Sequence, residues 1–312
     1  MKILAISTYR LPTLDHGSNG LGRFVYDFIR HFRDKWDYSF EIFCHPQSDF
    51  EWQDIVTHEY TNPIRDLGKI YTTFRNGNFD LIMDFTHGKI LSNAYRYESL
   101  PILNYIMDEE CRYNPSNCVV ANNYQAKRFP QSLVVPIGIN LDNFPLVENK
   151  KNYLSFCGKI ELRKGYDIAL RIAESTNHEI RFAGPNMDGN APSLPNWLGE
   201  IKDHKILCKH IGESKCLLYP SRSEAGGLAI LEAMAMGTPT ITITGTGTSC
   251  HVKHEITGFI ANNMEEAIEY VNRVGELSPV EIRKYCEREF DIFKNYEILN
   301  QSMLDVKNGK RW

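Results

Sequence analysis

The sequence lacks the features that define several classes of protein. No stretch of its 312 residues approaches the run of about 18 apolar residues that a membrane-spanning helix needs, and no segment is of low complexity. The eight cysteines include no C-x-x-C pair, which favours buried free thiols in a reducing compartment over disulfides or a metal cluster. A net charge of −4 gives no overall attraction to nucleic acid or to an anionic membrane. We therefore expect a soluble, cytoplasmic protein.

The composition is that of a folded chain, with 42% hydrophobic and 24% charged residues. Its length suits two domains of about 150 residues each. The first apolar run, Lys2–Ser7, is too short for a signal peptide and has no cleavage site, so we expect it to be a β-strand.

Strand-like and helix-like segments alternate along both halves of the chain, which predicts an α/β fold with parallel sheets covered by helices on both faces. The expected strands are Lys2–Ser7, Ser39–Cys44, Asp80–Phe85, Ile102–Met107, Cys118–Ala121, Leu133–Pro136, Tyr153–Cys157, Glu179–Ala183, Ile206–Cys208, Cys216–Tyr219 and Thr240–Thr244. The expected helices are Gly22–Phe32, Asn122–Phe129, Gly165–Ser175, Gly227–Met236 and Glu265–Val274. A polar segment, Asn143–Asn152, is the expected linker, and two sheets facing each other would create one ligand cleft.

The most informative segment spans residues 216–240. An apolar strand is followed by a loop that carries Glu224, and Gly226-Gly227 opens a helix of strong helix formers. The first N–H groups of a helix have no partner within the helix, so strand, glycine loop and helix N-terminus together predict an anion site.

Two carboxylates, Glu224 and Glu232, flank this predicted anion site. Carboxylates are poor partners for phosphates, so we expect them to receive hydroxyl groups. A ligand with phosphates in the middle and polyols at both ends is a nucleotide sugar.

The segment resembles the Glu-x7-Glu signature of retaining glycosyltransferases of family 4, E-x-x-G-x-x-x-x-E-A-M-A-x-G-x-P. Besides the two glutamates, the matching positions are Gly227, Ala233, Met234, Ala235, Gly237 and Pro239. The resemblance implies the GT-B fold, two Rossmann-like domains facing a central cleft. The alternative is an ordinary Ala/Met-rich core helix with a solvated glutamate at each end.

The resemblance also implies that each domain binds a different substrate. Residues 1–145 would form the acceptor-binding domain and residues 146–289 the nucleotide-sugar-binding domain. Residues 290–312 would form a C-terminal helix that crosses back to the first domain.

Residues 156–165, F-C-G-K-I-E-L-R-K-G, resemble the family's F-x-G-R-x-x-x-x-K-G element, with Lys159 in the arginine position and Lys164 in the lysine position. Fixed cations stabilise the charge that builds on the diphosphate when the glycosidic bond breaks. Lysine keeps this charge but lacks the bidentate fork of arginine, and Arg163 is a candidate to compensate. A basic turn that faces solvent is the alternative.

Residues 16–25, H-G-S-N-G-L-G-R-F-V, resemble the G-G-x-G-R loop that follows the family's first strand. Gly20 and Gly22 would let the backbone approach the donor diphosphate, while Asn19 replaces the first glycine of the pair. A simple tight turn is the alternative. The helix that follows is basic, because it carries Arg23, Arg30, His31, Arg33 and Lys35. Such a helix either contacts an anionic membrane or, more commonly, faces solvent.

On the acceptor side, relatives often carry a histidine close to the sugar, where this chain has Met107. His87 ends the preceding strand and is the candidate to reach the same cleft; capping or packing is its alternative. The acidic residues Asp108, Glu109 and Glu110 either receive acceptor hydroxyls or, more commonly for such a cluster, face water.

The mechanism that the resemblance implies is retaining and metal-independent, with no metal ligands and no cofactor beyond the donor substrate. Glu232 would bind the ribose hydroxyls and Glu224 the C3 and C4 hydroxyls of the sugar. Lys159 and Lys164 would stabilise the leaving diphosphate, and main-chain amides at Gly226, Gly227 and Leu228 would complete its cradle.

Three functions stay open at this point. The first is a hexosyltransferase-type enzyme acting on a saccharide or glycolipid. The second is a non-catalytic nucleotide-sugar-binding subunit, which the departures at Asn19, Met107 and Lys159 allow. The third is a transferase acting on modified DNA or protein, which the acidic charge balance disfavours.

Overall fold

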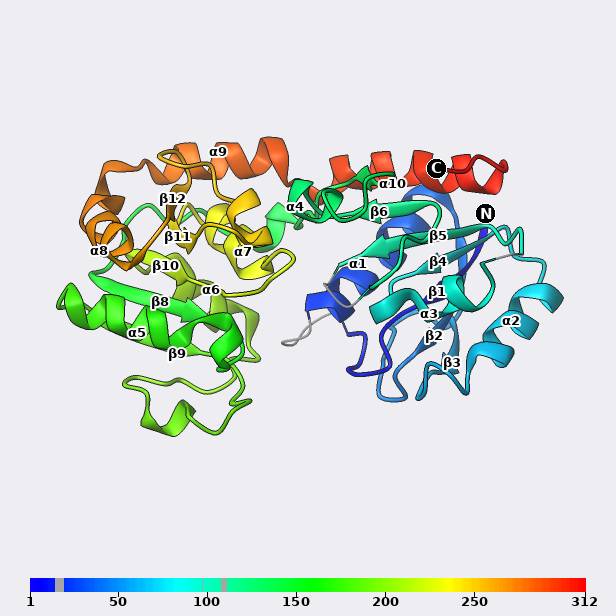
Figure 1. Cartoon of the computed structure of the whole chain (residues 1–312), viewed down its shortest axis with the longest axis horizontal. Coiled ribbons are helices and arrows are strands. Elements are labelled where there is room, and N and C mark those ends of the chain that lie inside the picture. Colours follow the sequence, from blue (N-terminus) through cyan, green and yellow to red (C-terminus); the bar gives the residue numbers. More distant parts are fainter. Residues whose placement is uncertain (15–19, 97, 108–110) are drawn as a thin grey trace. The chain divides into compact units, whose positions relative to one another are not determined.

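The computed structural model describes residues 1–14, 20–96, 98–107 and 111–312. The chain divides into two compact units (Figure 1). Unit 1 contains Met1–Ala121, Gln125–Val135 and Tyr296–Trp312, and unit 2 contains Asn122–Tyr124 and Pro136–Asn295. The expected linker, residues 143–152, thus belongs to unit 2.

Unit 1 is built on a seven-stranded parallel sheet with the strand order β3-β2-β1-β4-β5-β6-β7. The strands are β1 (Lys2–Ile6), β2 (Ser39–Cys44), β3 (Val56–Glu59), β4 (Leu81–Asp84), β5 (Ile102–Ile106), β6 (Cys118–Val120) and β7 (Leu133–Val134). The order of its first six strands is that of the Rossmann fold, in which ligands bind where the order reverses. In unit 1 this point lies beyond the carboxyl ends of β1 and β4.

Strands β1, β4, β5 and β6 of unit 1 are almost wholly buried, because helices cover both faces of the sheet. These helices are α1 (Gly20–Trp36), α2 (Leu67–Asn76), α3 (Ile90–Ala94), α4 (Asn123–Ala126) and α10 (Ile292–Lys307). Phe24, Phe28 and Phe32 recur at helical spacing on the buried face of α1, and the ring of Tyr296 from α10 packs against all three. The C-terminal helix is thereby part of the core of unit 1.

Unit 2 contains a five-stranded parallel sheet with the order β12-β11-β10-β8-β9. The strands are β8 (Tyr153–Cys157), β9 (Glu179–Ala183), β10 (Cys216–Tyr219), β11 (Thr240–Ile243) and β12 (Gly258–Ala261). Counted from β8 this is the doubly wound order 2-1-3-4-5, which reverses between β8 and β10. A ligand site is therefore expected beyond the carboxyl ends of these two strands.

Two groups of helices cover the sheet of unit 2: α5 packs with α8, and α7 packs with α6 and α9 (Figure 1). Their bounds are α5 (Tyr166–Ser175), α6 (His204–Gly212), α7 (Leu228–Ala235), α8 (Met264–Arg273) and α9 (Pro279–Glu289). The predicted α/β class with parallel, doubly wound sheets is confirmed for each unit.

One predicted strand is wrong: Ile206–Cys208 lies within helix α6. The carboxylate of Asp203 caps this helix, accepting hydrogen bonds from the backbone N–H groups of Lys205 and Ile206 at 2.8 and 3.1 Å. Ile206 is exposed whereas Cys208 and Ile211 are buried, which is helical spacing. A run of three apolar residues is too short to distinguish the two periods.

The sequence analysis also missed three helices, α2, α3 and α9, and two strands, β3 and β12. Strand β3, with the sequence V-T-H-E, has no buried residue. Strand β12 is buried but only four residues long. Short or polar edge strands are defined by the neighbour that they pair with, which only the folded sheet supplies.

Candidate functional site

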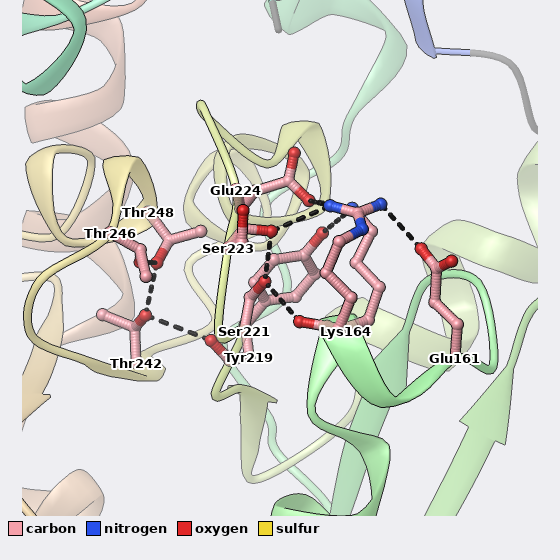
Figure 2. A network of polar contacts seen from close by, with 10 residues as sticks. Glu161, Lys164, Tyr219, Ser221, Ser223, Glu224, Thr242, Thr246 and Thr248 are labelled. Carbon is pink, nitrogen blue, oxygen red and sulfur yellow. Dashed lines mark hydrogen bonds and ion pairs between the residues drawn. The ribbon is translucent and has the colours of Figure 1, made fainter. Parts of the chain in front are cut away.

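Two polar turns meet beyond the carboxyl ends of β8 and β10, where the strand order of unit 2 reverses (Figure 2). The first is η3 (Leu162–Lys164), and the second is the segment 220–227 between β10 and α7. The hydroxyl of Ser221 and the backbone N–H of Arg222 both donate to the carbonyl of Arg163, at 3.1 and 2.9 Å. These bonds hold the two turns together at the place where such sheets bind ligands.

Glu224 lies between two cations of the opposite turn (Figure 2). Its carboxylate is paired with the ammonium of Lys164, which also donates to the hydroxyl of Tyr219 at 3.2 Å. Arg163 Nη1 lies 3.7 Å from Glu224 Oε2 and donates to the carbonyl of Ser223 at 2.8 Å. The predicted Lys164 and Glu224 are therefore brought together, and Arg163 lies beside them.

Burial, which is the largest cause, together with the positive charges of Arg163 and Lys159 lowers the pKa of Lys164 to about 7. Lys159, at the carboxyl end of β8, is thus close enough to affect Lys164 electrostatically. An amine that titrates near neutral pH becomes fully charged when an anion binds beside it. The turn between β8 and α5 is therefore suited to a ligand whose charge is negative.

The N-terminus of α7 begins beside this cluster. Gly227 precedes the helix with φ +117°, a left-handed conformation in which a side chain would be strained, and no side chain caps the helix. The first N–H groups of α7 are therefore positioned as donors to an anion. Gly226, Gly227 and Leu228 lie together here, as the sequence predicted for a phosphate cradle.

A second loop closes against the glycine loop. Gly247 N–H donates to the carbonyl of Glu224 at 2.8 Å, and a Cβ at Gly247 would lie 2.1 Å from the carbonyl oxygen of Ala225. Only glycine permits this approach. The segment that follows β11 therefore fixes the backbone that carries Glu224.

A chain of threonine hydroxyls supports the same backbone (Figure 2). Thr242 Oγ1 donates to the carbonyl of Tyr219 at 3.1 Å, and Thr248 Oγ1 lies 2.8 Å from that of Thr242 and 2.6 Å from that of Thr246. The sequence analysis took Thr240–Thr244 only as a β-branched strand. Alternating threonines at the end of a strand are a signal that could have indicated the hydrogen-bonded chain.

Glu232 lies on the buried side of α7, with 4% of its surface exposed. Its charge contributes to raising the pKa of Tyr219, although burial is the larger cause. Unit 2 therefore gathers seven predicted residues in one region: Lys159, Lys164, Glu224, Gly226, Gly227, Leu228 and Glu232. The roles assigned to them stay predictions.

The other three predicted residues belong to unit 1, beyond the ends of β1 and β4. Gly20 and Gly22 lie in the first turn of α1, so the predicted loop position is wrong for Gly20, whereas Gly22 was expected to begin the helix. The helix begins earlier than expected, and the N–H groups of a first helical turn still lack partners within the helix. His87 begins the short turn η1 (His87–Lys89) after β4 and is partly exposed.

Met107 follows β5 and is partly exposed, while Asn19 and the acidic residues Asp108, Glu109 and Glu110 lie outside the described residues. The basic face of α1 is largely compensated by acidic neighbours. Ion pairs on this face join Arg30 to Asp27, Arg33 to Asp34 and Asp54, and Lys35 to Glu297. These pairs favour the solvated-face interpretation of α1 over a membrane-binding one.

Within residues 1–14, 20–96, 98–107 and 111–312, no three His, Cys, Asp or Glu side chains are grouped so that they could hold a metal ion. In the same part of the chain, no helix combines the length and the apolar character that crossing a membrane requires.

Comparison with known proteins points to one class of enzyme. The family model of "Glycosyl transferases group 1" matches residues 195–289, which include β10, Glu224, the glycine loop and α7. An uncharacterized 41.2 kDa protein in the cps region of Klebsiella pneumoniae is 23% identical over 203 residues. That match covers 55% of this chain and 54% of the relative, so the chain spans about half the length of this relative.

Solved structures share the fold across nearly the whole chain. HepE from Anabaena in complex with UDP-glucose superposes with a TM-score of 0.75 at 15% identity, over 98% of this chain and 100% of HepE. The lipopolysaccharide outer core galactosyltransferase WaaB in its apo form gives a TM-score of 0.70 at 15% identity, over 98% and 99% of the two chains. The chain therefore has the fold of the GT-B glycosyltransferases, and its residues 195–289 match the family model of the glycosyl transferases group 1.

Proposed function

We propose that this protein is a retaining, metal-independent glycosyltransferase that moves a sugar from a nucleotide-diphosphate donor to a hydroxyl of a saccharide or glycolipid. The observation that carries the proposal is the group of Lys164, Glu224 and the glycine-opened helix α7 at the point where the strand order of unit 2 reverses. HepE, which was solved with UDP-glucose, and WaaB, a lipopolysaccharide galactosyltransferase, support the donor and the acceptor class respectively.

The donor diphosphate would bind at the N-terminus of α7. Amides of Gly227 and Leu228 donate to its oxygens, and Lys159 and Lys164 supply positive charge. This arrangement follows from the left-handed Gly227 and from the uncapped helix end.

Donor binding would also change the partner of Lys164. In the ligand-free protein Lys164 is paired with Glu224. A diphosphate carries more charge than one carboxylate and attracts the ammonium more strongly, so Glu224 becomes available to accept hydrogen bonds from sugar hydroxyls. Glu232, one turn into α7, is the proposed partner of the ribose hydroxyls.

In the reaction the bond between the anomeric carbon and the phosphate oxygen breaks, and the acceptor oxygen forms its bond to that carbon on the same face of the sugar. The acceptor proton moves to the departing phosphate oxygen. The protein supplies no nucleophile in this scheme; it positions the donor and stabilises the negative charge that develops on the diphosphate. His87, at the end of β4 in unit 1, is the proposed acceptor-side residue.

The first test is thermal unfolding with UDP-, GDP- and ADP-sugars, using wild type, Glu232→Ala and the control Glu269→Ala on the exposed side of α8. A donor at about 100 times its Kd adds roughly 2.7 kcal/mol, which raises Tm by about 5 °C. We expect this rise with one nucleotide class in wild type and in Glu269→Ala, and its loss in Glu232→Ala. No rise with any donor would contradict the proposal.

Turnover separates an enzyme from a binding subunit. Transfer to saccharide and lipid-linked acceptors is measured by the release of the nucleotide. The anomeric configuration of the product is assigned by NMR, and the rate is compared with and without EDTA. The proposal requires a retained anomeric configuration and an unchanged rate in EDTA. Donor binding with neither transfer nor donor hydrolysis would instead favour a non-catalytic subunit.

A further inference from the structure

A histidine without a hydrogen-bond partner lies buried beside the glycine loop of unit 2. His251 is 2% exposed, and neither Nδ1 nor Nε2 has a partner among the described residues. Its ring packs edge-to-face on Phe290, with the ring centres 5.5 Å apart. A buried polar group without a partner lowers stability, so the two unpartnered nitrogens of His251 need an explanation, which the surroundings of the ring suggest.

The ring of His251 faces Gly226. A Cβ at Gly226 would lie 3.2 Å from Cε1 and 3.9 Å from Nε2 of the imidazole. The residues just before Gly226 are held in place, because the carbonyl of Ala225 accepts from Asn122 Nδ2 and that of Glu224 accepts from Gly247 N–H. The imidazole therefore lies against the backbone of Gly226, directly after the two residues whose carbonyls are hydrogen-bonded.

The chemistry of the imidazole suits a role as a neutral donor. Burial lowers the pKa of His251 to about 4, so near pH 7 the ring is uncharged and carries one N–H donor and one acceptor nitrogen. It offers a hydrogen bond without placing a charge in the core of unit 2.

The geometry of a peptide group connects this donor to the proposed phosphate site. The N–H and C=O of one trans peptide point in opposite directions, and flanking glycines allow the peptide to rotate at little cost. If the N–H of Gly227 turns outward to a diphosphate, the carbonyl of Gly226 turns inward, where it needs a donor. His251 is the buried side chain that the structure places there.

We propose that His251 is a positioning residue for the donor site: its imidazole N–H donates to the carbonyl of Gly226 in the nucleotide-bound protein and so holds the Gly227 amide toward the diphosphate. The inference rests on the proposed use of this loop for a nucleoside diphosphate. It predicts that His251 affects binding of the diphosphate but not of the nucleoside.

The experiment measures two quantities, the Tm of the ligand-free protein and the affinities for a nucleoside diphosphate and its nucleoside by calorimetry. The ligand pair is the one that wild type binds most tightly among UDP with uridine, GDP with guanosine and ADP with adenosine. The variants are His251→Phe, which keeps the ring shape without the donor, and His251→Gln, whose amide N–H restores one. The matched control is His210→Phe in α6, because His210 is also buried and its Nε2 also lacks a partner.

We expect His251→Phe to keep or raise Tm and to bind the diphosphate about tenfold more weakly, as loss of one hydrogen bond implies. Its affinity for the nucleoside stays that of wild type, and His251→Gln recovers most of the diphosphate affinity. His210→Phe is expected to leave both affinities unchanged.

Two results would overturn the role of His251 alone: wild-type diphosphate affinity in His251→Phe, or an equal loss of diphosphate and nucleoside affinity. If wild type binds none of the three nucleoside diphosphates, the proposed function itself is wrong and this inference is overturned with it. Binding of a nucleoside diphosphate by wild type therefore distinguishes failure of the His251 proposal from failure of the proposed function.

Discussion

Each unit has a lysine–carboxylate pair at its strand reversal, but the two pairs differ in burial. In unit 1, Asp84 at the end of β4 pairs with Lys89 at 3.7 Å, and the exposed fractions of the two side chains are 0% and 2%. In unit 2, Glu224 after β10 pairs with Lys164, and the exposed fractions are 17% and 13%. A lysine–carboxylate ion pair is therefore fully buried in unit 1, which we call the sealed pair, and partly exposed in unit 2, which we call the accessible pair.

The sealed pair stabilises a turn. The carboxylate of Asp84 accepts from the N–H and hydroxyl of Thr86 at 2.8 and 2.7 Å, and Lys89 donates to the carbonyls of Asp84 and Thr86 at 3.1 and 2.5 Å. Lys89 itself has a left-handed backbone with φ +50°. This network fixes the turn that carries His87, whereas in the proposed function Lys164 exchanges Glu224 for the donor diphosphate.

The largest effect is expected from breaking the sealed pair. Asp84→Ala leaves the ammonium of Lys89 buried without its carboxylate, and such a loss lowers the free energy of unfolding by about 3–5 kcal/mol. Glu224→Ala is expected to lower it by less than Asp84→Ala does, since Glu224 and Lys164 keep 17% and 13% of their side-chain surface exposed. Urea unfolding of both variants measures the difference.

A double variant is the control for this comparison. Asp84→Ala combined with Lys89→Met removes both charges and should recover part of the loss. Equal destabilisation by Asp84→Ala and Glu224→Ala would show that burial does not distinguish the two pairs.

A third lysine, Lys150, is buried without a carboxylate partner among the described contacts and shows what burial alone does to a lysine. Lys150 donates to the carbonyl of Gly212 at 2.8 Å, to that of Met236 at 3.1 Å and to the hydroxyl of Thr238 at 2.8 Å, so it satisfies the ends of α6 and α7. Lys150→Met leaves these acceptors without their donor and should lower the free energy of unfolding by about 2 kcal/mol. An unchanged urea midpoint would show that water replaces the ammonium.

The same lysine gives a pH signature. Burial lowers the pKa of Lys150 to about 7 from its ordinary 10.5, so between these values the unfolded chain binds a proton that the folded chain does not. Stability therefore rises with pH through this window, and it should rise less in Lys150→Met.

The last effect concerns ligand affinity rather than stability, and it arises at the accessible pair. Because the pKa of Lys164 is about 7, the ammonium that attracts a diphosphate is lost as pH rises through this value. We expect the affinity for a nucleoside diphosphate to fall by up to about tenfold per pH unit above pH 7. In Lys164→Arg the cation persists, so calorimetry from pH 6 to 9 should show a flat profile; a fall of equal size in both proteins would exclude Lys164 as its source.

Much of the fold is present in local patterns of the sequence. The bounds of Ser39–Cys44, Tyr153–Cys157, Glu179–Ala183 and Cys216–Tyr219 were predicted as the structure has them, because continuous or alternating apolar residues between turn residues indicate a strand. The sequence also predicted the helix after Gly226-Gly227, with Glu224 before it and Glu232 within it. Where the apolar signal was short, as at Ile206–Cys208, the helical cap at Asp203 determined the outcome.

The sequence by itself determined which chemical groups follow each strand: the glycines, cations and carboxylates near the ends of β8 and β10. Only the tertiary structure decided which of them meet, because strand order places β8 beside β10 although α5, β9 and α6 separate them along the chain. It also decided burial, which seals Asp84 with Lys89 and leaves Lys164 with Glu224 accessible. His251 lies outside every motif, and its importance arises solely from the backbone that packs against it.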